Sequence, residues 1–237
     1  SSLYACGNIT SLSLKAISAS PLINRAMPLL LLLPDAIGSV SDSFAALWQS
    51  RQSYSPSYYL ERLFRPYGQQ VYAFEYSALM VHPVINTQRL VQQLPQQAQL
   101  DCLTHGVGGV LAELLALAAS QAFNESIYQD LHARGEADLA NALRELVRLT
   151  QQKQLRVNRI VNLAVPLRGW PLAQASLTHW VSWLSAHQRP LLGVTPHLKL
   201  FLPVWLGLAH ALKIQTDDLI GLKALQPTDP LIRVLND

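Results

Sequence analysis

Short apolar runs bounded by turn-forming residues recur along the chain, and this pattern predicts buried β-strands. The first run is five consecutive leucines, Leu29–Leu33, which lie between Pro28 and Pro34. Runs of this length without polar alternation are typical of strands covered on both faces, as in a parallel sheet. The same pattern predicts three further strands: Val71–Glu75, Leu100–Thr104 and Arg159–Val165.

Apolar residues at helical spacing occupy much of the remaining chain. We expect Asp42 or Ser43 to cap the first helix, and Pro171 to open a later helix that contains Trp180 and Trp183. The other expected helical segments are Phe44–Gln52, Val84–Leu94, Val110–Ala122, Ala137–Gln151, Pro203–Leu212 and a last turn at Leu219–Leu222.

Alternation of strands and helices implies right-handed crossovers between parallel strands. The predicted fold class is therefore α/β, a doubly wound, mostly parallel sheet flanked by helices. No linker or repeat divides the sequence, so we expect one domain over residues 1–237, as part of a larger protein.

Composition narrows the class of protein. Half of the 237 residues are apolar and 14% are charged, which excludes a disordered chain. The longest apolar run, Leu29–Leu33, is too short to cross a bilayer. Cys6 and Cys102 are expected to be free thiols in the cytoplasm, and a disulfide between them is the alternative.

The net charge of +3 is mild and gives little reason to expect a nucleic-acid partner. The densest basic segment has no interleaved aromatic residue and contains Glu145, so we expect a solvated helix face. Binding of an anionic partner is the alternative. Its members are Arg144, Arg148, Lys153, Arg156 and Arg159.

The segment Thr104–Gly109 has the strand, tight turn and helix context of a hydrolase nucleophile turn, G-x-S-x-G. Its central residue is Gly106, which has no side chain and cannot act as a nucleophile. His105 precedes the turn, and we expect it to pack and to form a hydrogen bond. Cys102 lies three positions earlier on the strand, so the two side chains should lie on opposite faces.

Several segments, in this order and spacing, resemble the lipase-like branch of the α/β-hydrolases, in particular bacterial lipase-like domains. The turn matches the Thr-His-Ser-x-Gly-Gly pattern of that family except at the serine. The resemblance is carried by Leu29–Ser39, Asp42–Phe44, Val71–Tyr76, Pro83–Asn86, Thr104–Gly109, Asn162–Gly169, Gly221–Leu222, Pro227–Leu231 and Leu235–Asn236.

The departures from that family pattern concern the residues that would carry catalysis. Gly106 stands at the nucleophile position, and Pro34-Asp35 stands where the family has His-Gly at the oxyanion loop. A carboxylate there would oppose the negative charge of a transition state. The family's acid and histidine follow the segment that resembles Pro227–Asn236, so we expect the last strands and both residues to be lacking before Asp237.

The resemblance therefore implies a catalytically inactive α/β-hydrolase-like domain that acts as a scaffold, interaction or ligand-binding module. The expected ligand-binding residues are Asp35, His105, Gly106 and Val107. The alternative is a serine ester hydrolase whose serine was changed and whose terminal segment is absent. Pro34-Asp35 and Val107 favour natural loss, because an engineered change normally affects one site.

No metal or cofactor is expected. His82, His179, His187, His197 and His210 have no carboxylate or cysteine partner at ligand spacing. The partners that we expect are other domains or subunits of a larger assembly. A small-molecule ligand is the alternative kind of partner.

Lack of the last strands would leave Ile160–Ala164 as an unpaired apolar edge, which is an aggregation hazard. We therefore expect the edge to be covered by the Trp180–Leu212 helices, by further sequence or by another chain. Trp170, Trp180 and Trp183 are expected in the core or in a lid.

Overall fold

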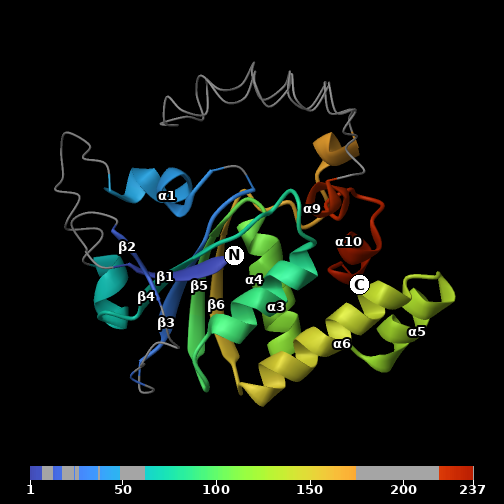
Figure 1. Cartoon of the computed structure of the whole chain (residues 1–237), viewed down its shortest axis with the longest axis horizontal. Coiled ribbons are helices and arrows are strands. Elements are labelled where there is room, and N and C mark those ends of the chain that lie inside the picture. Colours follow the sequence, from blue (N-terminus) through green and yellow to red (C-terminus); the bar gives the residue numbers. More distant parts are fainter. Residues whose placement is uncertain are drawn as a thin grey trace.

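The computed structural model describes residues 1–6, 13–17, 24, 27–36, 38–48, 62–174 and 219–236. Their strands form one six-stranded sheet in the order β2-β1-β4-β3-β5-β6 (Figure 1). The strands are β1 Ser2–Cys6, β2 Leu14–Ala16, β3 Leu29–Leu33, β4 Val71–Glu75, β5 Gln99–His105 and β6 Arg156–Leu163.

The strands β4, β3, β5 and β6 are parallel, which confirms the four predicted strands and the mostly parallel sheet. Leu32 pairs with Ala73, and Leu33 pairs with Thr104. The antiparallel strands β1 and β2 extend the sheet beyond β4 and were not predicted. Both are short and only partly buried, so neither produces a long apolar run.

Helices cover both faces of the sheet. Helix α1 (Val40–Trp48) lies on one face, whereas α3 (Pro83–Gln93), α4 (Gly108–Ala119) and α6 (Ala137–Gln152) lie on the other (Figure 1). The remaining helices are α5 Glu125–Ala133, α9 Ile220–Lys223, α10 Pro230–Val234 and the 3-10 turns η1 Arg65–Tyr67 and η2 Pro171–Gln174. The helices expected around Trp180 and Pro203–Leu212 lie outside the described residues.

The five leucines of β3 supply both halves of the core. Leu29, Leu31 and Leu33 point into the large cluster under α3, α4 and α6. Leu30 and Leu32 point into a smaller cluster with Phe44 of α1. All five leucines are buried, as the sequence predicts for a strand covered on both faces.

Helix α1 begins earlier than the sequence predicts. The Ser39 hydroxyl accepts a hydrogen bond from the Asp42 N–H (3.2 Å), and the Asp42 carboxylate accepts one from the Ser39 N–H (2.8 Å). This reciprocal pair is a capping box, so Ser39 is the cap and Asp42 is the third helical residue. The expectation that Asp42 or Ser43 caps the helix is therefore wrong.

Strand β6 lies at one edge of the sheet formed by the described residues. Its side chains are mostly exposed, including Val161 (53% exposed) and Leu163 (44% exposed). The described residues therefore do not provide the cover that we expected for this edge. The Trp180–Leu212 segment lies outside them, and cover by further sequence or by another chain stays a prediction.

None of the described helices has the length and apolarity that a bilayer crossing requires.

The C-terminal helices α9 and α10 pack on the same side as α3 and α6, and contribute Leu222 and Leu231 to the large core cluster (Figure 1). The Gly221 N–H donates to the Leu79 carbonyl (3.0 Å). A Cβ at Gly221 would overlap the Ala78 carbonyl oxygen and lie 2.8 Å from the Val81 carbonyl oxygen. This helix therefore docks as closely as it does because residue 221 is glycine.

Replacement of Gly221 by alanine is expected to lower the free energy of unfolding by about 3 kcal/mol, because the added methyl group meets backbone atoms that cannot turn aside. Gly135→Ala is the control. Gly135 has φ of +81° but no neighbour within 4 Å of a Cβ, so its cost is the backbone strain alone, about 1 kcal/mol. Urea denaturation of both variants measures the difference, and an equal loss at the two positions would contradict the packing argument.

Candidate functional site

The order of the parallel strands places a switch point between β3 and β5. From β3 the chain passes through α1 to β4 on one side, and from β5 it passes through α4 to β6 on the other. Open α/β sheets bind ligands in the crevice where adjacent connections diverge in this way, at the carboxyl ends of the strands. Asp35 follows β3 and Gly106 follows β5, so the fold itself places these two residues at this position.

Gly106 forms a sharp junction between strand and helix, as the sequence predicts. Its φ of +53° is in the left-handed region that favours glycine. The Gly106 N–H donates to the Leu163 carbonyl of β6 (2.9 Å), and the Gly106 carbonyl accepts from the Gly109 N–H (3.1 Å). The turn is therefore held to the neighbouring strand before α4 begins.

Glycine is also required at the first position of α4. A Cβ at Gly108 would overlap the Leu33 carbonyl oxygen and lie 2.7 Å from the Pro34 carbonyl oxygen. The amino end of α4 therefore lies directly against the carboxyl end of β3. This approach brings the Asp35 side chain over the turn.

The Asp35 carboxylate occupies the space that a side chain at position 106 would fill. A Cβ at Gly106 would overlap both the carboxylate carbon and oxygen, and would lie 2.9 Å from the Asp35 Cβ. Asp35 Oδ1 accepts hydrogen bonds from the Val107 N–H (3.0 Å) and from the Ala36 N–H (2.7 Å). One donor follows the turn residue and the other belongs to the loop after β3, and α/β-hydrolases place their oxyanion-binding N–H groups at two positions of this kind.

Neighbouring groups fix the backbone of Asp35. Its N–H donates to the Ser43 hydroxyl (3.0 Å), and the preceding Pro34 carbonyl accepts from the Tyr76 hydroxyl (2.8 Å). Burial, and secondarily the charge of Asp35, raise the pKa of Tyr76 well above its ordinary value. Tyr76 therefore stays a neutral donor beside a carboxylate.

Of the four expected ligand-binding residues, the structure brings together Asp35, Gly106 and Val107. His105 ends β5 and is half-buried, and its Nδ1 has no hydrogen-bond partner among the described residues. The hydrogen bond expected for His105 is therefore not formed at that nitrogen. The preceding Thr104 donates to Asn162 Oδ1 (2.6 Å), which ties β5 to β6 just below the turn.

The two cysteines are free thiols, and the disulfide that the sequence left open does not form. Burial raises the pKa of Cys6 and of Cys102 to about 12, so both remain protonated at neutral pH. A thiol in this state is a poor nucleophile and a poor metal ligand. The described residues also contain no group of three histidine, cysteine or acidic side chains placed to hold a metal ion.

His82 has a structural role that sequence reasoning missed. Its Nδ1 accepts a hydrogen bond from the Val84 N–H (3.3 Å) at the start of α3. Burial lowers the pKa of His82 to about 4, so the ring is neutral and able to accept this bond. The His82-Pro83 pair was the available signal, because proline is common at the first helical position.

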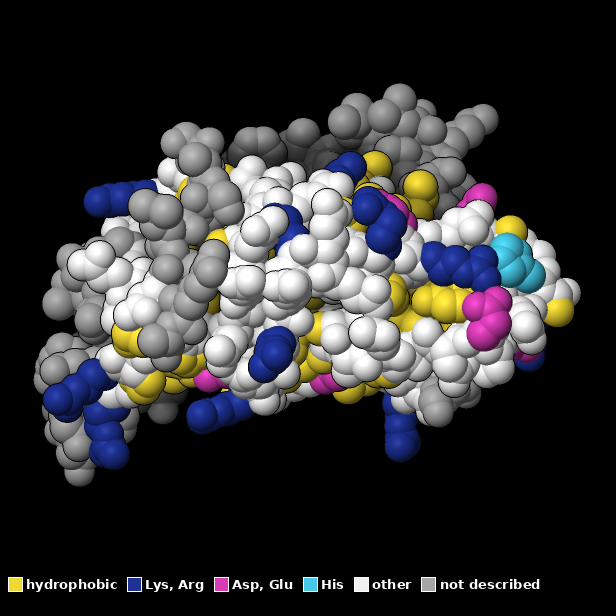
Figure 2. Space-filling view, turned by 90° about the horizontal axis from the view of Figure 1, so that it is seen from below, with side chains coloured by type: hydrophobic (Ala, Val, Ile, Leu, Met, Phe, Trp, Pro, Cys, Tyr) yellow, Lys and Arg dark blue, Asp and Glu magenta, His cyan; other side chains and the backbone are white. Residues whose placement is uncertain are grey.

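Members of the basic segment are paired locally. Arg144 contacts Glu125 (3.0 Å) and lies over the Tyr128 ring, while Arg148 binds Glu145 through two hydrogen bonds of 2.7 Å. These pairs support the expectation of a solvated helix face for Arg144 and Arg148, the residues of the basic segment that take part in them on α6. Arg156 and Arg159 lie instead on β6. Figure 2, which shows one face, has its Lys and Arg side chains spread among other residues.

A buried carboxylate in the middle of β5 was also missed. Asp101 is 4% exposed and accepts a hydrogen bond from the Tyr67 hydroxyl (2.8 Å). Burial and this hydrogen bond raise the pKa of Tyr67 to about 12. Asp101 Oδ1 has no partner among the described residues. The signal in the sequence was one acidic residue inside the apolar run Leu100–Leu103.

Comparisons with protein-family models, curated proteins and solved structures gave no match to this chain.

The overlap at the turn predicts coupling between positions 35 and 106. Gly106→Ala is expected to lower the free energy of unfolding by about 3 kcal/mol, from left-handed strain plus contact with the carboxylate. In an Asp35→Gly background the same change should cost about 1 to 2 kcal/mol, since only the strain remains. A double-mutant cycle by urea denaturation measures the difference, and additive effects would show that the carboxylate does not occupy this space.

Proposed function

We propose that this chain is a non-catalytic α/β domain of the lipase-like hydrolase type, which acts as a scaffold or interaction module. The observation that carries the proposal is the position of Asp35. Its carboxylate lies over Gly106 and accepts both N–H groups that an active hydrolase would direct at its substrate.

Electrostatics supports a loss of catalysis at this position. In ester hydrolysis, a pair of N–H donors stabilises the negative oxygen of the tetrahedral intermediate. Here both donors are bound to an anion of the chain itself. A second negative oxygen would have to displace the carboxylate or lie beside it, and Gly106 offers no nucleophile to form that intermediate.

The alternative was a serine hydrolase whose nucleophile was changed to glycine. Asp35 weighs against it, because a side chain at position 106 and the Asp35 carboxylate require the same space. Return of serine alone would not give an open site. Two positions therefore differ from the hydrolase pattern: Gly106 lacks the nucleophile, and Asp35 fills its place. Because an engineered change normally affects one site, this favours natural divergence.

Assembly and location follow as parts of the same proposal. The exposed Val161 and Leu163 on the edge strand β6 suit a further domain or subunit, since an apolar edge is a hazard when left open. The two free thiols suit the reducing environment of the cytoplasm.

Restoration of serine is the direct test of lost catalysis. Gly106→Ser, alone and with Asp35→Gly, is expected to hydrolyse 4-nitrophenyl acetate no faster than the original protein, because the proposal assigns no general base to the site. Release of nitrophenol is followed spectroscopically with urea-unfolded protein as the baseline. Turnover by the double variant at about 1 to 10 per second, as in ordinary enzymes, would refute the proposal.

Removal of the Asp35 side chain should uncover an anion site. Acetate at about 100 mM is expected to raise the Tm of Asp35→Ala by about 2 to 4 °C over chloride, because it restores the lost acceptor for two N–H groups. Neither the original protein nor Asp229→Ala should respond in this way. Asp229 is the matched control, as its carboxylate accepts the Leu231 N–H of α10 (2.9 Å). An equal response of Asp35→Ala and the original protein would contradict self-occupation.

A further inference from the structure

A groove of about 300 Å³ lies where the start of α6 meets the start of α3 and the C-terminal helices α9 and α10 (Figure 1). Six of its eleven lining residues are apolar. They are Ile85, Leu139, Ala142, Ile220, Ala224 and Pro230. The other five are His82 and Lys223 together with three acidic residues, Glu136, Asp138 and Asp229.

The helices around this groove are fixed against one another. Leu139 and Ala142 are three positions apart on α6, and side chains at this spacing share one face of a helix. Ile85 and Gln88 have the same spacing on α3, and Gln88 Nε2 donates to the Ala142 carbonyl (2.8 Å). Helix α9 is held beside them by the close packing of Gly221. The apolar residues of the three helices therefore face one common space.

Exposed apolar side chains extend this surface. Ile220 is 54% exposed although it lines the groove. Met80, which is 55% exposed, lies in the turn before α3 on which α9 docks through the Leu79 carbonyl. The other exposed large apolar side chains of the described residues, Val161 and Leu163, lie on β6. The groove is thus one of two places in the described part of the chain where apolar surface is open to a partner.

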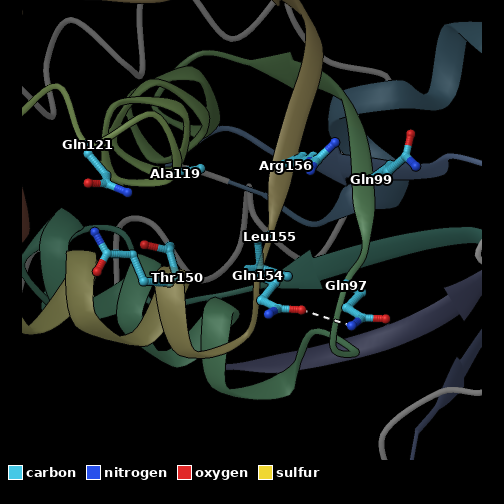
Figure 3. Close-up of a pocket in the computed structure, with 9 residues that line it drawn as sticks. Gln97, Gln99, Ala119, Gln121, Thr150, Gln154, Leu155 and Arg156 are labelled. Atoms are coloured by element: carbon cyan, nitrogen blue, oxygen red, sulfur yellow. Dashed lines mark hydrogen bonds between the residues drawn. The ribbon is translucent and has the colours of Figure 1, made fainter.

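A second hollow, at the amino ends of β5 and β6, is lined differently (Figure 3). Five of its nine lining residues are glutamines, and all five are exposed. Gln97 Nε2 donates to Gln154 Oε1 (2.8 Å), as the dashed line in Figure 3 shows. Its apolar lining is limited to Ala119 and Leu155. This hollow therefore offers little apolar surface to a ligand, unlike the groove between the helices.

The groove is negatively charged, although the whole chain has a net charge of +3. Its three acidic residues and one lysine give a formal charge of −2. Burial lowers the pKa of His82 to about 4, so this ring adds no charge at neutral pH. Burial raises the pKa of Asp229, and the charge of Glu136 raises it further while Lys223 opposes this change. These charges therefore lie close enough to act on one another and on a common ligand.

Two of the acidic residues form no ion pair that would neutralise them. Asp229 caps α10 by accepting the Leu231 N–H (2.9 Å). Glu136 stands at the cap position of α6, but its side chain makes no capping hydrogen bond. Among the described residues, neither Glu136 nor Asp138 forms an ion pair, in contrast to the acidic residues of α5. Both carboxylates are thus available to a cationic group.

We propose that this groove binds a basic peptide segment of a partner protein. One apolar side chain of the peptide enters the groove, and lysine or arginine residues beside it meet Glu136 and Asp138. The volume suits a single large side chain, since it is at the lower limit of pockets that enclose whole small ligands, about 300 to 1,000 Å³. An apolar centre with a charged rim is the usual organisation of a protein interface. The inference rests on the proposed role as an interaction module and names the kind of partner.

Titration of the ¹⁵N-labelled chain with short peptides separates the apolar part of binding from the charged part. The probe is acetyl-Lys-Lys-Leu-Phe-Lys-Lys-amide. One comparison peptide has alanine in place of leucine and phenylalanine, and the other has glutamine in place of the lysines. The probe is expected to shift the amide signals of Leu139, Ile220 and Ala224 and to bind about fivefold or more tightly than either comparison peptide. No shift at these residues, or equal binding of either comparison peptide, would overturn the proposal.

A pair of double variants tests the two carboxylates. Glu136→Gln with Asp138→Asn should weaken binding of the probe about fivefold, because two exposed ion pairs are lost. Glu125→Gln with Asp130→Asn is the matched control, since it removes the same two residue types from α5, outside the groove lining. Its affinity should stay unchanged. An equal loss in both variants would show attraction by overall charge alone, and the proposal would fail.

A second pair of variants tests the apolar contact. Ile220→Ser should weaken binding of the probe about fivefold, whereas Val161→Ser on β6, at nearly the same exposure of 53%, should have no effect. Loss of affinity at Val161 instead would place the peptide on β6 and overturn the proposal. The Tm of each variant confirms that it is folded. None of these outcomes bears on ester hydrolysis by the Gly106→Ser variants, so failure of this inference and failure of the proposed loss of catalysis are distinguishable.

Discussion

The approach of α4 to the end of β3 is the constraint on which the candidate site depends. Gly108 permits this approach because any side chain there would overlap the Leu33 carbonyl. Gly106 provides the left-handed turn that precedes it. Once helix and strand are this close, the loop after β3 has little room, and the Asp35 carboxylate meets the Val107 N–H at the start of the helix. Backbone packing thus determines which side chain meets the helix terminus.

The contact between the Asp35 carboxylate and the start of α4 is favourable for electrostatic reasons that are independent of catalysis. The amino end of a helix carries partial positive charge and unpaired N–H groups. In a hydrolase these groups are left for the substrate, so the free protein keeps unsatisfied donors in its active site. Here Asp35 accepts the Val107 N–H at the start of α4, together with the Ala36 N–H of its own loop. These bonds therefore stabilise the turn.

Sequence patterns predicted the central sheet well, because buried parallel strands leave continuous apolar runs. Leu29–Leu33 and Val71–Glu75 match β3 and β4 at both ends. The antiparallel strands β1 and β2 escaped prediction since they are short and half-buried. At the site, the glycine turn was predictable from its neighbours, while the placement of Asp35 was not. Which N–H a carboxylate meets depends on the distance between two chain segments about seventy residues apart.

The crevice at the carboxyl ends of the strands is occupied by the chain itself. In open α/β sheets the carboxyl ends of the strands form the ligand crevice. In this chain the carboxyl end is closed by its own Asp35, and the satisfied donors there add stability. At the amino end, the exposed residues Gln97, Gln121 and Gln154 have positive φ. The order of the fold at the carboxyl end therefore does not depend on a ligand to satisfy the two donors.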